Sequence, residues 1–218
     1  MQAGAGTGTA APAQSGDRTV SASGSGITIV SHASGFLRNQ VSFTGSVPAR
    51  SAGQVVEIER LGHETNWTWA PTAHSTVASD GSFSVIWRAN HIGRFTFRAV
   101  LQSASGLRAA GASPTVTVTV YRVATATQYG PGFYGKRTAC GVKLTRKTIG
   151  VANRTLHCGE HVSVYYQGRT LSVPVIDRGP YANGADFDLT MATGRALGIG
   201  GTAQIGAVSL PHAPASAG

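Results

Sequence analysis

The chain has 218 residues, enough for one large or two small domains, and 41% of them are hydrophobic. Only 12% are charged and 29 are glycine, a balance typical of β-rich proteins with short turns. No run of 18 apolar residues occurs, so we expect no membrane span. The net charge of +9 favours polyanionic partners, but the chain has no dense Lys/Arg tract, and we therefore expect no nucleic-acid binding.

The two ends of the chain are rich in small residues and poor in large apolar ones. Residues 1–22 lack the basic and apolar regions of a signal peptide, so we expect a disordered tail there. Residues 211–218 have a similar composition, and we expect a second disordered tail.

Residues 23–122 carry short β patterns separated by turn signals. Alternating or β-branched stretches occur in ITIVS, QVSFTGSV, QVVEIERL, NWTWAP, SFSVIWR, RFTFRAVL and TVTVTVY. Seven short strands at this spacing predict an immunoglobulin-like β-sandwich. Two sets of residues alternate on one strand face and are predicted core: Phe83, Val85 and Trp87, and Phe95, Phe97 and Ala99. Trp67 and Trp69 also share a face, and they either pack in the core or form a stacking platform for a ligand.

Residues 123–210 form a second predicted domain. The segment 161–177 is typical of a hairpin with its tip at Gln167-Gly168, and residues 203–210 are typical of a last strand. Five or six strands and one short helix predict a small closed β-barrel. The sequence therefore predicts an all-β chain, a sandwich followed by a barrel.

The one predicted helix lies in DLTMATGRALGIGG. Either Asp188 or Thr190 can cap its N-terminus, and Gly198 can end it. Its predicted apolar side consists of Ala192, Ala196 and Leu197.

The chain has two cysteines, Cys140 and Cys158, without the CxxC partners of a zinc site. A single disulfide is the simpler interpretation; it indicates an oxidising compartment and contributes about 3 kcal/mol in the chain-entropy model. His157, Glu160 and His161 lie near Cys158, but a disulfide removes the thiolate from such a cluster. We expect no metal and no cofactor.

Three of the nine acidic residues fall between Val175 and Thr190: Asp177, Asp186 and Asp188. Asp177 follows the apolar run VPVI at the predicted end of a strand, before a sharp Arg-Gly-Pro turn. Partial burial raises the pKa of such a carboxyl and suits it to general-acid work, whereas the neighbouring Arg178 opposes the shift. The alternative is that Asp177 only caps the turn.

Several motifs of the second domain resemble the RlpA-like (rare lipoprotein A) double-psi β-barrel family. They are YGPGFYGKRTACG, GVANRTLHCG, VPVIDRGPYANGADFDLT and ALGIGG, in this order between Thr125 and about Leu210. The resemblance implies a six-stranded double-psi barrel with a polysaccharide groove and a partner in the cell wall, peptidoglycan glycan strands above all. Some members are lytic transglycosylases. The related expansins loosen walls without detectable hydrolysis.

The resemblance also implies roles for individual residues. Asp177 matches a residue required for activity, and Asp177 with Asp188 matches two essential aspartates of expansins, so both are candidate catalytic residues. Asp188 can instead cap the helix, and Asp186 is expected to point elsewhere. The candidate substrate-binding residues are Tyr129, Tyr134, Asn153, Arg178 and Tyr181. The aromatic residues among them, with Phe133, either stack on sugars or pack in the domain.

Two positions depart from the lytic pattern. Val142 stands where lytic members usually carry Glu, and Asn153 stands where they carry His. Glycan cleavage needs an acid and a second group, and here only Asp188, or Glu160 without family support, offers one. Two hypotheses follow for an extracellular or wall-associated protein: a lytic transglycosylase with Asp177 as acid, or an expansin-like protein that binds polysaccharide without cleaving it.

Overall fold

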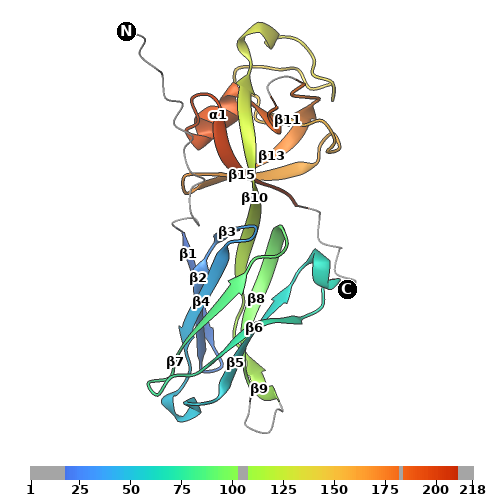
Figure 1. Ribbon diagram of the computed structural model, residues 1–218. Coiled ribbons are helices and arrows are strands. Elements are labelled where there is room, and N and C mark those ends of the chain that lie inside the picture. Colours follow the sequence, from blue (N-terminus) through green and yellow to red (C-terminus); the bar gives the residue numbers. More distant parts are fainter. Residues whose placement is uncertain (1–17, 103–107, 182–183, 211–218) are drawn as a thin grey trace, which may run out of the picture. The chain divides into compact units, whose positions relative to one another are not determined.

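The computed structural model describes residues 18–102, 108–181 and 184–210, with the side chains of 108–111 left out. The chain divides into two compact units: the first ends at Arg122 and takes up the chain again from Val208, and the second consists of Val123–Ala207 among the described residues. The all-β prediction is confirmed, since strands and a single α-helix make up the described parts (Figure 1). In these parts no helix has the length and apolarity needed to cross a membrane. Most of both predicted tails, 1–17 and 211–218, falls outside the described residues.

The first unit contains a four-stranded antiparallel sheet in the order β1-β2-β4-β7. Its strands are β1 (Thr19–Gly24), β2 (Ile27–His32), β4 (Gln40–Ser46) and β7 (Ser82–Arg88). Strand β1 begins inside the segment 1–22 that we expected to be disordered, because Thr19 to Gly24 pair residue by residue with β2.

The second sheet of this unit has the order β10-β8-β5-β6, with β3 on β10 and β9 on β8. Its strands are β3 (Ser34–Phe36), β5 (Val55–Leu61), β6 (Ala70–Thr76), β8 (Gly93–Gln102), β9 (Arg108–Ala112) and the first part of β10 (Val116–Tyr129). The expected strand NWTWAP (66–71) is wrong in its first four residues, because β6 begins only at Ala70. Asn66 and Trp67 have φ values of 50° and 56°, and such left-handed residues do not continue a strand.

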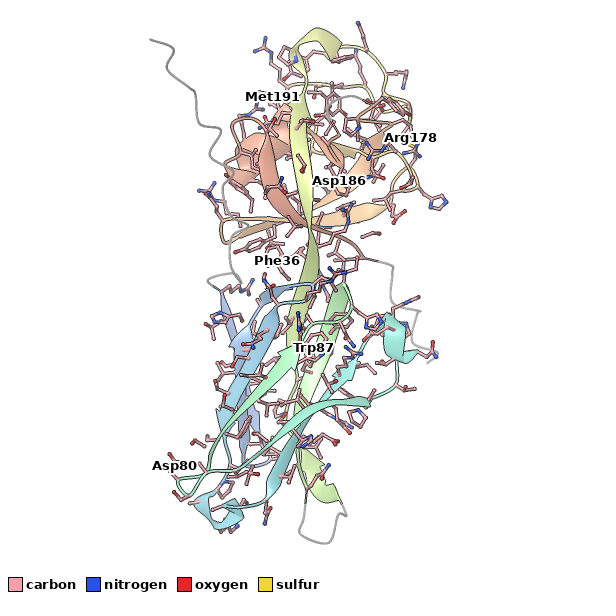
Figure 2. The ribbon with its side chains drawn as sticks, viewed as in Figure 1. Phe36, Asp80, Trp87, Arg178, Asp186 and Met191 are labelled. Atoms are coloured by element: carbon pink, nitrogen blue, oxygen red, sulfur yellow. A yellow bond between two sulfur atoms is a disulfide. The ribbon has the colours of Figure 1, made fainter. Side chains whose placement is uncertain are left out.

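Side chains from both sheets meet in one core, so this unit is a β-sandwich. The ring centroids of Phe43 and Phe97 lie 4.6 Å apart, and Trp87 meets Phe95 edge-on (Figure 2). All six residues predicted for this core are buried: Phe83, Val85, Trp87, Phe95, Phe97 and Ala99. The immunoglobulin-like classification itself stays a prediction.

The second unit is a closed six-stranded barrel. Its strands are the second part of β10, β11 (Val151–Ala152), β12 (His161–Tyr166), β13 (Arg169–Asp177), β14 (Phe187–Thr190) and β15 (Ala203–Ser209). The hydrogen-bonded order is β14-β11-β13-β12-β15-β10, and a parallel pairing of β10 with β14 closes the ring. The predicted hairpin β12–β13 is confirmed, with Gln167 and Gly168 at positive φ in its two-residue turn. The short 3-10 helix η3 (Pro131–Phe133) also belongs to this unit, whereas η1 (Ala49–Ser51) and η2 (His63–Thr65) lie in the sandwich.

Helix α1 (Met191–Leu197) packs against β13 and β14. Of the two predicted caps, Thr190 is the one used, since its side chain accepts the N–H of Thr193, whereas Asp188 lies in β14. Gly198 ends the helix in the left-handed region, as predicted. Ala192 and Leu197 are buried, but Ala196 is exposed, which corrects the expected apolar side.

We predict that Phe97→Ala lowers the free energy of unfolding of the sandwich by about 3–5 kcal/mol, because a fully buried ring leaves a cavity. All three tryptophans of the chain lie in this unit, so tryptophan fluorescence during urea unfolding follows it selectively. Ile86→Ala is the control, because the Ile86 side chain is exposed, and it should change the free energy of unfolding by less than about 0.5 kcal/mol. Equal effects of the two substitutions would contradict the core assignment.

Candidate functional site

The two-residue strand β11 determines where the acidic residues point. Val151 pairs with Val175 on β13 and with Leu189 on β14, and all three side chains belong to the barrel core. Next along the strand, Ala152 pairs with both Asp177 and Asp188. Because directly paired residues point to the same side of a sheet, both aspartates lie on the face turned away from the core.

A β-bulge makes this arrangement possible. The register on β13 shifts between Val151 and Ala152, so that Ile176 is the extra residue between the paired Val175 and Asp177. Strict alternation would put Asp177 on the same side as Val175, inside the barrel. The bulge instead brings the carboxyl of Asp177 out beside that of Asp188.

Asp177 is half-buried at the end of β13. Its Oδ1 accepts the backbone N–H of Arg178 at 2.8 Å and that of Ala139 at 2.9 Å. The turn-capping role considered for Asp177 is therefore present, and the same oxygen also holds the loop that contains Ala139.

Asp188 is also half-buried, and its Oδ1 accepts the hydroxyl of Thr127 on β10 at 2.9 Å. Burial raises the pKa of Asp188 above its ordinary value. The hydrogen bond from Thr127 acts in the opposite direction, and the negative charge of Asp177 raises the pKa further. Asp188 therefore keeps its proton to a higher pH than a solvated aspartate.

Tyr129, two residues after Thr127 on β10, completes this group. Its pKa is raised by burial, by the charges of Asp177 and Asp188 and by its proximity to the Asp177 side chain, so it remains a protonated phenol. The hydroxyl is buried beside the Asp177 side chain, and a hydrogen-bonding interaction with that side chain contributes to the raised pKa. Tyr129 is therefore a protonated donor beside two carboxyls. We call Tyr129, Asp177 and Asp188 the acidic cluster.

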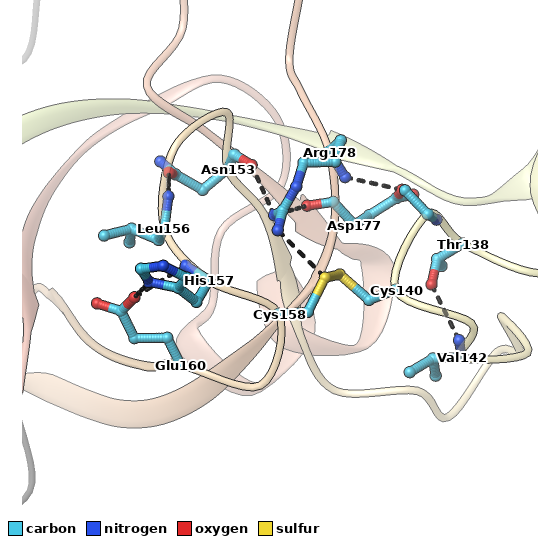
Figure 3. The surroundings of a disulfide bond; sticks show 11 residues. Thr138, Cys140, Val142, Asn153, Leu156, His157, Cys158, Glu160, Asp177 and Arg178 are labelled. Atoms are coloured by element: carbon cyan, nitrogen blue, oxygen red, sulfur yellow. Dashed lines mark hydrogen bonds and ion pairs between the residues drawn. A yellow bond between two sulfur atoms is a disulfide. The ribbon is translucent and has the colours of Figure 1, made fainter.

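The loop that touches Asp177 is fixed by the predicted disulfide, which is confirmed: Cys140 and Cys158 are bonded, with their Cα atoms 5.6 Å apart. Figure 3 shows the guanidinium of Arg178 beside this bond, where it donates to Cys158 Sγ at 3.2 Å and to the backbone oxygen of Asn153 at 3.3 Å. Arg178 thus ties together the segments that surround Asp177.

Asn153 is buried and its amide is occupied by the protein itself. Its Oδ1 accepts the N–H groups of Thr155 and Leu156, and its Nδ2 donates to the backbone oxygen of Asp186. Its own N–H donates to the backbone oxygen of Asp177. These bonds give Asn153 a structural role, and its predicted contact with substrate stays a prediction.

The aromatic residues predicted to bind substrate differ in their solvent exposure. Tyr181 is 80% exposed and Phe133 is 54% exposed, whereas Tyr134 is half-buried with the Arg146 guanidinium 5.7 Å above its ring. Phe133 meets the Tyr129 ring edge-on at 6.1 Å, which places one exposed aromatic beside the acidic cluster. For Tyr181 and Tyr134 no such contact with the cluster is found among the described residues.

Asp186, expected to point elsewhere, does so (Figure 2). Its Oδ2 accepts the N–H of Thr125 and its own N–H donates to Thr125 O, a clasp that joins the start of β14 to β10. The sequence prediction missed two groups that bind the carboxyls of the acidic cluster: the Thr127 hydroxyl and the Ala139 N–H. Thr127 was recognisable, because it lies two residues before Tyr129 on one strand and so shares its face.

The second unit is similar to known proteins. Residues 124–209 match the family model described as lytic transglycolase. A probable endolytic peptidoglycan transglycosylase RlpA from Synechocystis sp. is 41% identical over 76 residues, which cover 34% of this chain and 24% of that protein. Its counterpart from Aquifex aeolicus is 37% identical over 76 residues and 34% of each chain. The solved Streptomyces papain inhibitor has 24% identity over 41% of this chain and 93% of its own, with a TM-score of 0.34.

The closed six-stranded barrel, the match to the family model and the two RlpA relatives confirm the resemblance predicted from the motifs. Residues 124–209 form an RlpA-like double-psi β-barrel domain. The chain spans about a quarter to a third of the length of the two RlpA relatives.

The raised pKa of Asp188 has a consequence for stability. A carboxyl whose pKa is higher in the folded state destabilises the fold once the pH exceeds its unfolded pKa, and this penalty vanishes at low pH. We therefore predict that Asp188→Asn, which keeps an acceptor for Thr127, stabilises the barrel at a pH of about 7 but not at a pH of about 3. Urea unfolding followed by NMR signals of barrel amides measures this. A variant less stable than the parent at both pH values would contradict the prediction.

Proposed function

We propose that the barrel binds peptidoglycan glycan strands outside the cell and cleaves them as an endolytic transglycosylase. The observation that carries the proposal is the acidic cluster: two half-buried carboxyls on one outer face, on either side of Ala152, with the buried Tyr129 phenol beside them. The names of the relatives supply the substrate class. The disulfide supports an oxidising, extracellular location.

The hydrogen bonds of the two carboxyls bear on which of them donates the proton. Asp177, the acid predicted from the sequence, accepts two backbone N–H groups, which hold its carboxyl in place. Asp188 accepts the Thr127 hydroxyl and has a raised pKa, which favours its protonated form. We therefore assign proton donation to the pair as a unit, and the raised pKa of Asp188 helps this unit to keep a proton.

The proposed step is an intramolecular displacement. The protonated carboxyl gives its proton to the glycosidic oxygen as the bond from this oxygen to C1 breaks. The C6 hydroxyl of the same sugar attacks C1, forms the anhydro ring and loses its proton to the ionised carboxylate. One carboxyl ends ionised and the other protonated, and exchange with solvent restores both. The Tyr129 phenol donates a hydrogen bond to a sugar hydroxyl or to a carboxylate.

A second candidate function rests on a specific observation. At the position of the usual lytic Glu stands Val142, and at that of the His stands Asn153, whose amide is already occupied. With fewer polar groups around the carboxyls, an expansin-like protein that binds the wall without cleaving it is the alternative.

The experiment that separates the two uses purified, peptide-free glycan strands and measures anhydro-sugar ends. We expect products from the parent protein and a loss of about 10²–10⁴-fold in rate in Asp177→Asn and in Asp188→Asn, the range of general acid–base catalysis. Asp80→Asn, in the exposed turn before β7 of the sandwich (Figure 2), is the matched control and should keep full activity.

The opposite result is equally informative. Binding to wall sacculi without any anhydro-sugar product, at a strength that falls with added salt, contradicts the transglycosylase and supports the binding protein. Salt weakens such binding because exposed charges are screened within about 8 Å at physiological ionic strength.

A further inference from the structure

The sandwich unit contains a cavity of about 400 Å³ that the barrel chemistry does not explain. Its lining includes Trp67, His63, His91, Ile92 and Arg94, together with Ser209 and Leu210 at the end of β15. All of these residues belong to the compact unit that contains the sandwich, because the chain from Val208 onward is part of that unit. Clefts of this volume are the usual size of small-molecule sites.

The loop that carries Trp67 is held in an unusual conformation. Asn66 and Trp67 both have φ in the left-handed region, at 50° and 56°, which is rare for a bulky aromatic residue. Such strain persists only where the surrounding structure enforces it. Here the N–H groups of Trp67 and Thr65 both donate to Gly62 O, and Thr65 Oγ1 accepts the N–H of Gly62.

The result of this loop geometry is an indole that is 37% exposed at the cavity. A strained position that exposes an aromatic ring, instead of burying it, points to a binding role. Of the two alternatives for Trp67, packing in the core is therefore wrong.

The other lining side chains indicate the ligand class. Ile92, 41% exposed, adds a second apolar surface, while His63, His91 and Arg94 are exposed polar groups that can bond to hydroxyls. Glu64 also lines the cavity, where Arg60 holds its carboxylate at 3.1 Å. An aromatic surface surrounded by planar polar groups fits a sugar ring, whose C–H face is apolar and whose edge carries hydroxyls.

Trp69 offers an internal contrast. The guanidinium of Arg98 covers its ring at 4.1 Å, and Arg98 in turn pairs with the buried Glu59 at 2.7 Å. Trp69 is not among the residues that line the cavity. The two tryptophans therefore do not form the predicted joint platform. Trp67 lines the cavity, whereas Trp69 stacks with Arg98.

We propose that this cavity is a second glycan site, which binds a sugar residue of a polysaccharide chain against Trp67. The proposal rests on the proposed function only for the choice of polymer, a peptidoglycan glycan strand. Two glycan sites on one chain hold a long polymer more strongly than either alone, because the second contact is intramolecular.

The test is a fluorescence titration of the full chain with purified, peptide-free glycan strands. Because every tryptophan lies in the sandwich, a saturable change in tryptophan emission reports this unit and not the barrel. We expect the change in the parent and in Asp177→Asn, which does not consume the ligand in the proposed mechanism. Trp67→Gly removes the indole and suits the positive φ of this position. In the Asp177→Asn background, this substitution should weaken binding to the sandwich about tenfold or more, equivalent to ~1.4 kcal/mol. Calorimetry measures the change in affinity.

Two further variants keep the test decisive. Ile92→Ser should also weaken binding, and it lies outside the strained loop, so a folding defect at Trp67 cannot imitate the result. Trp69→Phe is the matched control and should bind like the parent. No fluorescence change in any variant, or parental affinity in both Trp67→Gly and Ile92→Ser, would overturn the proposal. Binding at the cavity without anhydro-sugar products would leave it standing while contradicting the transglycosylase.

Discussion

The β-bulge at Ile176 is the constraint on which the rest of the barrel site depends. Without it, the alternation from Val173 and Val175 would direct the carboxyl of Asp177 into the apolar core, where an unpaired charge is strongly destabilising. With the bulge, Asp177 on β13 pairs with Ala152 from one neighbouring strand, and Asp188 on β14 pairs with it from the other. Bulges are frequent next to functional sites because they re-aim one side chain without breaking the sheet.

The surroundings of the acidic cluster are built from backbone contacts. Ala139 and Arg178 donate to Asp177, the disulfide fixes the loop of Ala139, and Asn153 joins the segments that follow β11 and β13. Such contacts hold the carboxyls in place, while burial and mutual repulsion raise the pKa of Asp188 at a cost to stability. Function and stability therefore oppose each other at this one residue.

Much of the fold was predictable, because its signals are local. Alternation identified the sandwich core around Trp87 and Phe97, and the hairpin turn at Gln167-Gly168 followed from the sequence alone. The bulge at Ile176 was not predictable, since it depends on the partner strand. The sequence left open whether Trp67 packs in the core or stacks on a ligand, because NWTWAP indicated a strand where two left-handed residues stand instead. Motifs located Asp177 and Asp188, but only the register shows that they share a face.

That shared face is the central claim, and it is tested most directly by the titration of Asp188 in carboxyl ¹³C NMR spectra. The account predicts a pKa above the ordinary value in the parent protein, because the side chain is half-buried and Asp177 is charged nearby. It also predicts that the pKa falls in Asp177→Asn, where the neighbouring charge is gone. An ordinary pKa in the parent that does not respond to Asp177→Asn would show that the two carboxyls do not form one site.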